Sequence, residues 1–207
     1  MGRYSLMVVI GLTGRACAGK DQYAQVFATL GCQVVDVDSL GHDALEKSKE
    51  RLIKEFGSQV LSDGKVDRKA LGAMVFSDQK KLRELESITH PVMVEQCKQY
   101  IREAKLQQKP AIILNAALLK RMNLELLCDQ VLFIKAPFLL RFFRCKGREG
   151  LSFKRFWKRE QAQKDIVPKA NIAGLSVVVL CNLLSKRVIH RQITTYCDTI
   201  GLRISSQ

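Results

Sequence analysis

The chain has 207 residues, of which 47% are hydrophobic and 26% charged, and a net charge of +14. This length suits one α/β domain with a core, and no apolar stretch approaches the ~20 residues that span a bilayer, so we expect no membrane span. The first residues lack the features of a signal peptide, which favours a cytoplasmic protein. Residues 136–207 hold 14 basic against 4 acidic residues, so this third is predicted to face an anionic partner unless it is only a solvated basic surface.

Apolar runs that predict buried strands alternate along the chain with segments of helical periodicity. The runs are LMVVIGL (6–12), QVVDV (33–37), AIILN (111–115), QVLFIK (130–135) and VVVLCN (177–182). Short β-branched runs between helices are typical of a parallel sheet that is covered on both faces. The sequence therefore predicts an α/β fold with a parallel sheet of about five strands flanked by helices.

Two helical segments are longer than a simple crossover requires. About 70 residues separate the second and third strands, which predicts an inserted helical lobe at about 46–109, and the polar segment 141–168 predicts a helical lid. We expect a single domain over 1–207, whose core comprises about 1–45, 110–140 and 175–207.

The stretch GRACAGKD (14–21) follows the first strand and resembles a phosphate-binding loop. In such loops glycines let the backbone approach the phosphates, a lysine supplies a positive charge, and a hydroxyl group binds magnesium. Gly14, Gly19 and Lys20 fit this pattern, whereas Asp21 stands where the hydroxyl residue is expected. The alternative is an ordinary glycine-rich turn with a solvated lysine.

The sequence departs from the usual phosphate-loop pattern at a second position as well. Many phosphate-loop enzymes carry an aspartate at the end of a later strand to hold magnesium, and here the third strand ends in Asn115. One hypothesis is that the changes are coupled, with Asp21 supplying the charge at the metal that Asn115 lacks. The competing interpretation is that both changes mark an eroded site.

Five segments together resemble the dephospho-CoA kinase family, over roughly residues 6–182. They are VVDVDSLGHDAL (34–45), the segment 63–91 with its Asp-Arg and Thr-His-Pro motifs, CDQVLFI (128–134), RCKGREG (144–150) and REQAQ (159–163). The resemblance implies a cytoplasmic phosphate-loop kinase that uses ATP and magnesium (Mg²⁺) to phosphorylate the ribose 3′-hydroxyl of dephospho-CoA. The partners that it implies are therefore small molecules.

The resemblance and the strand-end pattern assign roles to individual residues. Those expected to bind the nucleotide are Gly14, Cys17, Ala18, Gly19, Lys20, Asp21, Gln22 and Arg144, with Asp21 also at the metal. Those expected to bind dephospho-CoA are Asp36, Arg68, His90 and Gln163. Asp36, Lys20 and Arg148 are the candidate catalytic residues, because phosphoryl transfer needs an oriented hydroxyl group and charge stabilisation.

Each of these roles has a structural alternative. Asp36 could start the helix that follows it, and Arg144 and Arg148 could be solvated arginines one helical turn apart. Arg68 could serve a surface role next to Asp67. For His90, beside Pro91, a structural role is favoured over a catalytic one.

Cysteines and aromatics raise two further questions. The seven cysteines are scattered, odd in number and without a Cys-x-x-Cys pair, which favours a reducing compartment over a disulfide framework or a zinc site.

The stretch FKRFWKR (153–159) has the composition of a nucleic-acid surface, but its aromatics have the spacing of one helix face. Nucleic-acid binding is the less favoured alternative, as is a relative that binds nucleotide or CoA without efficient turnover.

Overall fold

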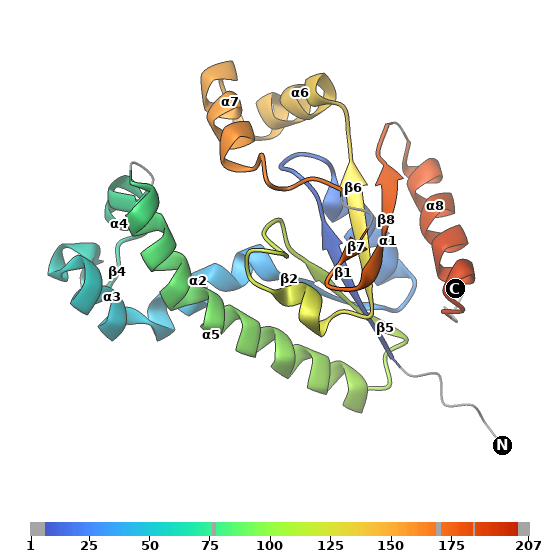
Figure 1. Cartoon of the computed structure of the whole chain (residues 1–207), viewed down its shortest axis with the longest axis horizontal. Coiled ribbons are helices and arrows are strands. Elements are labelled where there is room, and N and C mark those ends of the chain that lie inside the picture. Colours follow the sequence, from blue (N-terminus) through green and yellow to red (C-terminus); the bar gives the residue numbers. More distant parts are fainter. Residues whose placement is uncertain (1–6, 76–77, 169–170, 184, 203–207) are drawn as a thin grey trace. The chain divides into compact units, whose positions relative to one another are not determined.

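The structure is a computed structural model that describes residues 7–75, 78–168, 171–183 and 185–202 (Figure 1). The chain divides into two compact units. The first comprises Met1–Asp36 and Tyr100–Gln207, and the second comprises Val37–Gln99.

The first unit is built on a six-stranded sheet in the order β2-β5-β1-β6-β8-β7. Its strands are β1 (Val8–Thr13), β2 (Gln33–Asp36), β5 (Ala111–Asn115), β6 (Gln130–Lys135), β7 (Asn171–Ile172) and β8 (Leu175–Cys181). The first five in spatial order pair in parallel, whereas β7 pairs antiparallel with β8. The predicted five-stranded parallel sheet is therefore confirmed, and Leu6 of the first predicted strand lies outside the described residues.

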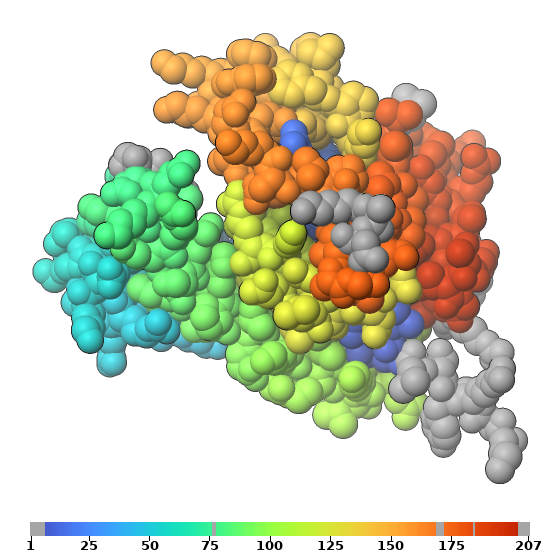
Figure 2. All heavy atoms as spheres, viewed as in Figure 1, coloured from blue at the N-terminus to red at the C-terminus, as the bar shows by residue number. Residues whose placement is uncertain are grey.

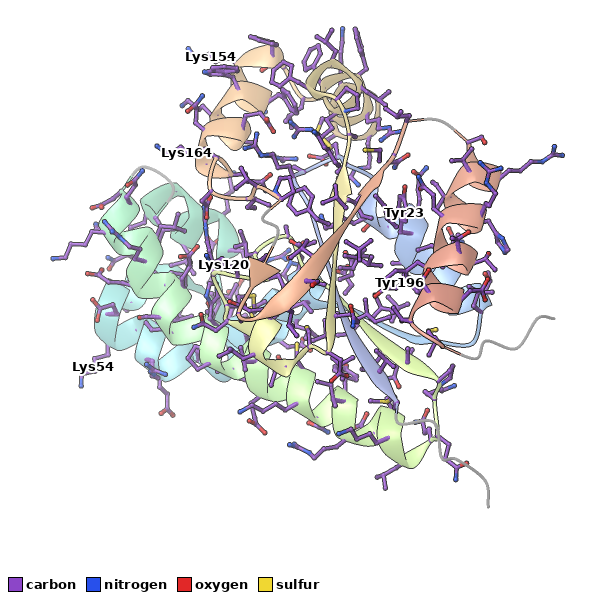
Figure 3. All side chains as sticks on the ribbon, turned by 45° about the vertical axis from the view of Figure 1, so that its right-hand side comes forward. Tyr23, Lys54, Lys120, Lys154, Lys164 and Tyr196 are labelled. Carbon is purple, nitrogen blue, oxygen red and sulfur yellow. A yellow bond between two sulfur atoms is a disulfide. The ribbon has the colours of Figure 1, made fainter. Side chains whose placement is uncertain are left out.

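Helices α1 (Lys20–Thr29) and α8 (Lys186–Thr199) pack together and share a hydrophobic core with the sheet. Tyr23 and Tyr196 extend from these helices into the core (Figure 3), and Phe27 packs edge-on against Tyr196. The Tyr23 hydroxyl donates a hydrogen bond to Oε1 of Gln192 at 2.6 Å. This packing fixes the start of α1, where the phosphate loop ends.

Helices α6 (Phe138–Glu149) and α7 (Phe153–Ala162) follow β6 and lie beyond the carboxyl end of the sheet (Figure 1). Phe156 of α7 is buried against Phe138 and Phe142 of α6. The segment after α7 lies against the segment after β5, which includes the short helix η2 (Leu124–Leu127) (Figure 2). There Arg121 binds both carboxylate oxygens of Asp165, at 2.8 and 2.7 Å.

The second unit consists mainly of helices and has its own core. Its elements are α2 (Val37–Lys47), α3 (Lys49–Phe56), η1 (Ser58–Val60), β3 (Leu61–Ser62), β4 (Lys65–Val66), α4 (Arg68–Val75) and the first part of α5 (Gln79–Leu106). Leu52, Val60 and Leu71 are among its buried residues. Helix α5 continues into the first unit, and no helix among the described residues is both long and apolar enough to cross a bilayer.

Candidate active site

The loop between β1 and α1 has the backbone that a phosphate-binding loop requires. Gly14 and Gly19 adopt φ values of 149° and 92°, a region that disfavours residues with a side chain. A Cβ atom at Gly14 would lie 2.3 Å from the Ile134 carbonyl oxygen, and one at Gly19 would lie 2.1 Å from Nδ2 of Asn182. The two glycines of the motif are thus required both by conformation and by space.

Lys20 is the first residue of α1 and is 9% exposed. Its Nζ donates a hydrogen bond to the Gly14 carbonyl oxygen at 3.4 Å, so the ammonium group lies within the loop. The N-terminus of α1 adds backbone N–H groups and the positive end of the helix dipole. The geometry therefore offers a positively charged cradle for an anion.

Two polar residues, Asp36 and Asn115, end the neighbouring strands β2 and β5. Asn115 is the register partner of Asp36 on β2 and of Leu12 on β1. Its Nδ2 donates a hydrogen bond to Oδ1 of Asp21 at 3.0 Å. The two residues at which the sequence departs from the usual loop pattern are therefore in direct contact.

The side-chain oxygen of Asn115 has no hydrogen-bond donor among the described residues. The residue is 5% exposed, and its buried Oδ1 accepts no hydrogen bond from the described part of the chain. A buried polar atom normally has a partner. The Asp21 carboxylate and Asn115 Oδ1 are both oxygen donors of the kind that magnesium prefers, although it is the amide nitrogen of Asn115 that faces Asp21.

Arg144 and Arg148 reach the phosphate loop from α6. Arg144 donates to the Ala18 carbonyl oxygen at 3.3 Å and to Oδ1 of Asn182 at 3.2 Å. Burial lowers the pKa of Arg144 below its ordinary value, an effect that nearby Tyr23 opposes. Nη1 of Arg148 lies 3.4 Å from Oδ2 of Asp21.

These groups surround a cavity of about 300 Å³ beside the loop. It is lined by Cys17, Gly19, Asp21, Gln22, Arg144 and Arg148. All six residues are among those that the sequence assigns to the nucleotide or to catalysis. The structure therefore brings together, in one cavity, the loop and lid residues that were predicted separately.

Asn182 holds the loop from the end of β8 and was not predicted as a site residue. It is 1% exposed, and its Nδ2 donates to the Ala18 carbonyl oxygen at 2.8 Å and to Oε1 of Gln22 at 3.0 Å. Because it follows a parallel strand at the same edge as Asn115, the strand-end pattern could have identified it.

An ion-pair network joins the loop to helices α6 and α7. Glu160 of α7 pairs with Arg141 of α6, whose Nη2 donates at 2.6 Å, and with Arg15 of the loop at 3.3 Å. Burial alone would raise the pKa of Glu160, but the hydrogen bonds from Arg141 and the charge of Arg15 keep it below its ordinary value. Residue spacing does not indicate this network, because it does not distinguish buried charges on a polar helix from solvated ones.

Arg159 and Gln163, near the end of α7, hydrogen-bond to groups that are distant in the sequence, so residue spacing does not indicate these contacts. Oε1 of Gln163 accepts a hydrogen bond from the Ala16 backbone N–H at 2.8 Å. Nη1 of Arg159 donates to Oε2 of Glu149 at 2.8 Å, and Arg148 donates to Oε1 of the same carboxylate at 2.6 Å. Burial raises the pKa of Glu149, but these two arginines outweigh it and leave the pKa lower than usual.

The predicted residues Arg68 and His90 lie in the second unit. Arg68 begins α4, and its guanidinium contacts Nε2 of His42. Asp67 accepts hydrogen bonds from the backbone N–H groups of Lys69 and Ala70, so it caps α4. His90 is half-buried within α5.

The structure corrects the expectation that the chain forms no disulfide. Cys17 of the loop is bonded to Cys145 of α6, with a Cα–Cα distance of 5.7 Å. The other five cysteines keep their thiols. The two bonded residues are 128 positions apart in the sequence, so only the fold brings them together.

Comparison with known proteins identifies the family. The dephospho-CoA kinase family model matches residues 8–183. The dephospho-CoA kinase of Borreliella burgdorferi is 35% identical over 185 residues, which cover 88% of each chain. The dephospho-CoA kinase of Anaeromyxobacter dehalogenans is 37% identical over 175 residues, which cover 83% of each.

Solved structures agree in fold. A protein of Thermus thermophilus superposes with a TM-score of 0.75 at 28% identity, covering 94% of this chain and 98% of its own. The dephospho-CoA kinase from Campylobacter jejuni has a TM-score of 0.60 at 21% identity and covers 94% and 97%. The phosphate loop, the parallel sheet and the matched family model confirm the predicted kinase, and the chain belongs to the dephospho-CoA kinase family.

Proposed function

We propose that the chain transfers the γ-phosphoryl group of ATP to the ribose 3′-hydroxyl of dephospho-CoA, giving CoA and ADP. The observation that carries this proposal is the loop itself, in which buried Lys20 and the N-terminus of α1 form a cradle for phosphates. Family membership identifies the acceptor, and an ATP-dependent kinase acting on small molecules is expected to work in the cytoplasm.

The nucleotide is held by the loop and by the lid. Backbone N–H groups of the loop other than those of Ala16 and Ala18, which are already hydrogen-bonded, are the candidates to bind the β- and γ-phosphates, and Lys20 would neutralise charge on them. Arg144 and Arg148 line the same cavity and supply two further cations. Arg148 is the candidate to bind the phosphoryl group during transfer, because its pair with Asp21 is exposed and the guanidinium can exchange that carboxylate for a phosphate oxygen.

Asp21 and Asn115 would hold magnesium, which neutralises charge on the phosphates during transfer. Asn115 Nδ2 holds one carboxylate oxygen of Asp21, and its own Oδ1 is left without a partner in the described chain. A carboxylate at position 21 thus retains a metal-binding oxygen while the amide at 115 positions it. This arrangement favours the coupled interpretation of the two departures over an eroded site.

Asp36 is the candidate to orient the acceptor hydroxyl group. It is exposed at the end of β2, in register with Asn115, so the carboxylate and the proposed metal pair share one sheet edge. A residue there faces the crevice in which ligands bind in open α/β sheets. Arg68 and His90 of the second unit, and Gln163 of the lid, remain candidates for binding dephospho-CoA.

The decisive experiment measures ADP formation from ATP and dephospho-CoA by the purified chain, with magnesium and then manganese. The Lys20→Ala variant is the blank, because it removes the buried ammonium group without adding a side chain that could replace it. Turnover that depends on both dephospho-CoA and Lys20 supports the proposal. Binding of either substrate without turnover would contradict it and would leave a binding protein that has lost kinase activity.

A second experiment tests the metal pair by exchanging its groups. Asp21→Ser leaves Asn115 without its acceptor, and Asn115→Asp places two carboxylates about 3 Å apart, which destabilises both. The double variant restores a hydroxyl group and one carboxylate. Affinity for Mn²⁺, followed by electron paramagnetic resonance in the presence of ATP, should fall in each single variant and recover in the double variant; independent losses would contradict the coupling.

A further inference from the structure

The disulfide joins two parts of the proposed nucleotide site. Cys17 lies in the phosphate loop and Cys145 lies on α6 between Arg144 and Arg148. Both cysteines are buried in one small cluster with Phe156, Cys145 completely. The bond therefore fixes the helix that carries the two lid arginines directly to the loop.

Noncovalent contacts hold the same helix near the loop without the bond. Arg141 donates to the Ala16 carbonyl oxygen at 3.4 Å, and Arg144 donates to that of Ala18 at 3.3 Å. These contacts can break and re-form, as a lid requires when nucleotide enters and leaves. A covalent bond at the same place removes that freedom.

Cys17, but not Cys145, faces a cavity that a small reagent can enter. Cys17 lines the cavity of about 300 Å³ beside the loop. Its Sγ lies 3.8 Å from Nη2 of Arg148 and 4.0 Å from Oε1 of Glu149, so one cation and one anion face it. Cys181, by contrast, is exposed and is not disulfide-bonded.

We propose that Cys17 and Cys145 form a reversible thiol–disulfide site that locks the lid helix α6 onto the phosphate loop. The oxidant is a low-molecular-weight disulfide, RSSR. The Cys17 thiolate attacks one of its sulfurs and releases RS⁻; the Cys145 thiolate then attacks the Cys17 sulfur of the mixed disulfide and releases the second RS⁻. Two protein thiols and RSSR thus become one protein disulfide and two RSH, and an excess of small thiol reverses the exchange.

The consequence for activity rests on the proposed function, whereas the formation of the bond does not. With the bond formed, α6 cannot leave the loop, so nucleotide exchange slows. With the bond reduced, the arginine contacts remain and the lid can open. Bound nucleotide should in turn protect Cys17, because it would occupy the cavity through which the reagent approaches.

The test equilibrates the full chain with dithiothreitol at a series of ratios of the reduced to the oxidised form. The buffers contain a zinc chelator, because Cys17, Cys145 and Glu149 lie close enough together to bind a metal ion when the cysteines are reduced. Peptide mapping locates the bond, hydrogen exchange of residues 138–149 reports the motion of α6, and release of a fluorescent ADP analogue reports nucleotide exchange. We expect the linked peptides of Cys17 and Cys145, slower exchange in α6, and release slowed about tenfold or more in the oxidised protein.

The controls separate this proposal from the kinase proposal. Cys145→Ser and Cys145→Ala should show no redox response, whereas Cys181→Ser should respond as the wild type does. The main comparison, between the oxidised and the reduced wild-type protein, requires no substitution. Absence of the linked peptides at every ratio, or a bond that changes neither α6 exchange nor nucleotide release, would overturn the proposal. If the analogue does not bind, the kinase proposal fails, while peptide mapping and hydrogen exchange still decide the redox site.

Discussion

Replacing Glu160 by Gln should destabilise the first unit more than the loss of an exposed charge in α6 or α7 does. The side chains of Glu160 and Arg141 are 6% and 5% exposed, and Arg15 is the second partner of the carboxylate. Removing one member of a buried ion pair leaves the other charge uncompensated, which costs about 3–5 kcal/mol. Since Gln keeps one oxygen acceptor, we expect about 3 kcal/mol, or a melting temperature lower by about 6–12 °C in a chain of this size.

Glu149→Gln is the matched control, because Glu149 also binds two arginines but is 27% exposed. Each exposed ion pair contributes about 0.2–1 kcal/mol, so the loss of both should cost at most about 2 kcal/mol and lower the melting temperature by no more than about 8 °C. Urea unfolding followed by circular dichroism gives the free energies of unfolding. Equal losses in the two variants, or a loss below about 1 kcal/mol for Glu160→Gln, would refute the argument that burial makes the inner pair decisive.

Three further predictions concern the same region. Lowering the pH should reduce the difference in unfolding free energy between the wild type and Glu160→Gln. The pKa of Glu160 lies below its ordinary 4.5, so the stabilisation by its carboxylate is complete above that pH and is lost as the pH falls through the lowered pKa. Measuring the free energy of unfolding as a function of pH checks this. Gly19→Ala would place a methyl group 2.1 Å from the buried Nδ2 of Asn182 and should abolish ATP binding as measured by calorimetry. The control Gly147→Ala lies in α6 with open space around it and should stabilise the protein by up to about 1 kcal/mol. Gln163→Ala removes the acceptor of the Ala16 N–H and should raise the KM for ATP severalfold while Gln163→Glu does not; an increase confined to the KM for dephospho-CoA would show instead that Gln163 binds the acceptor.

The parts that the sequence predicted are those specified by local pattern. The five parallel strands follow from short apolar runs, and Gly14, Gly19 and Lys20 follow from motif spacing beside the first strand. The contact between Asp21 and Asn115 was anticipated only as a coupling, since both positions depart from one pattern. Such inferences succeed because the residues involved are neighbours in sequence or ends of adjacent strands.

The parts that the sequence did not predict depend on how distant segments pack. Glu160 and Arg141 resemble solvated residues of polar helices until the two helices meet and exclude water around them. The bond between Cys17 and Cys145 likewise requires α6 to lie on the loop, and nothing in cysteine number or spacing indicates it. Buried polar partners and long-range bonds are tertiary properties, so periodicity carries no information about them.

The lid contacts also explain how the loop is prepared for an anion before one binds. Arg141 holds the Ala16 carbonyl oxygen, and Arg144 and Asn182 hold that of Ala18. In a planar trans peptide the C=O and the following N–H point in opposite directions, so fixing these two oxygens also fixes the direction of the next two N–H groups. The lid side chains therefore orient donors that they do not touch, and weakening either carbonyl contact should reduce phosphate affinity through backbone disorder as well as through lost charge.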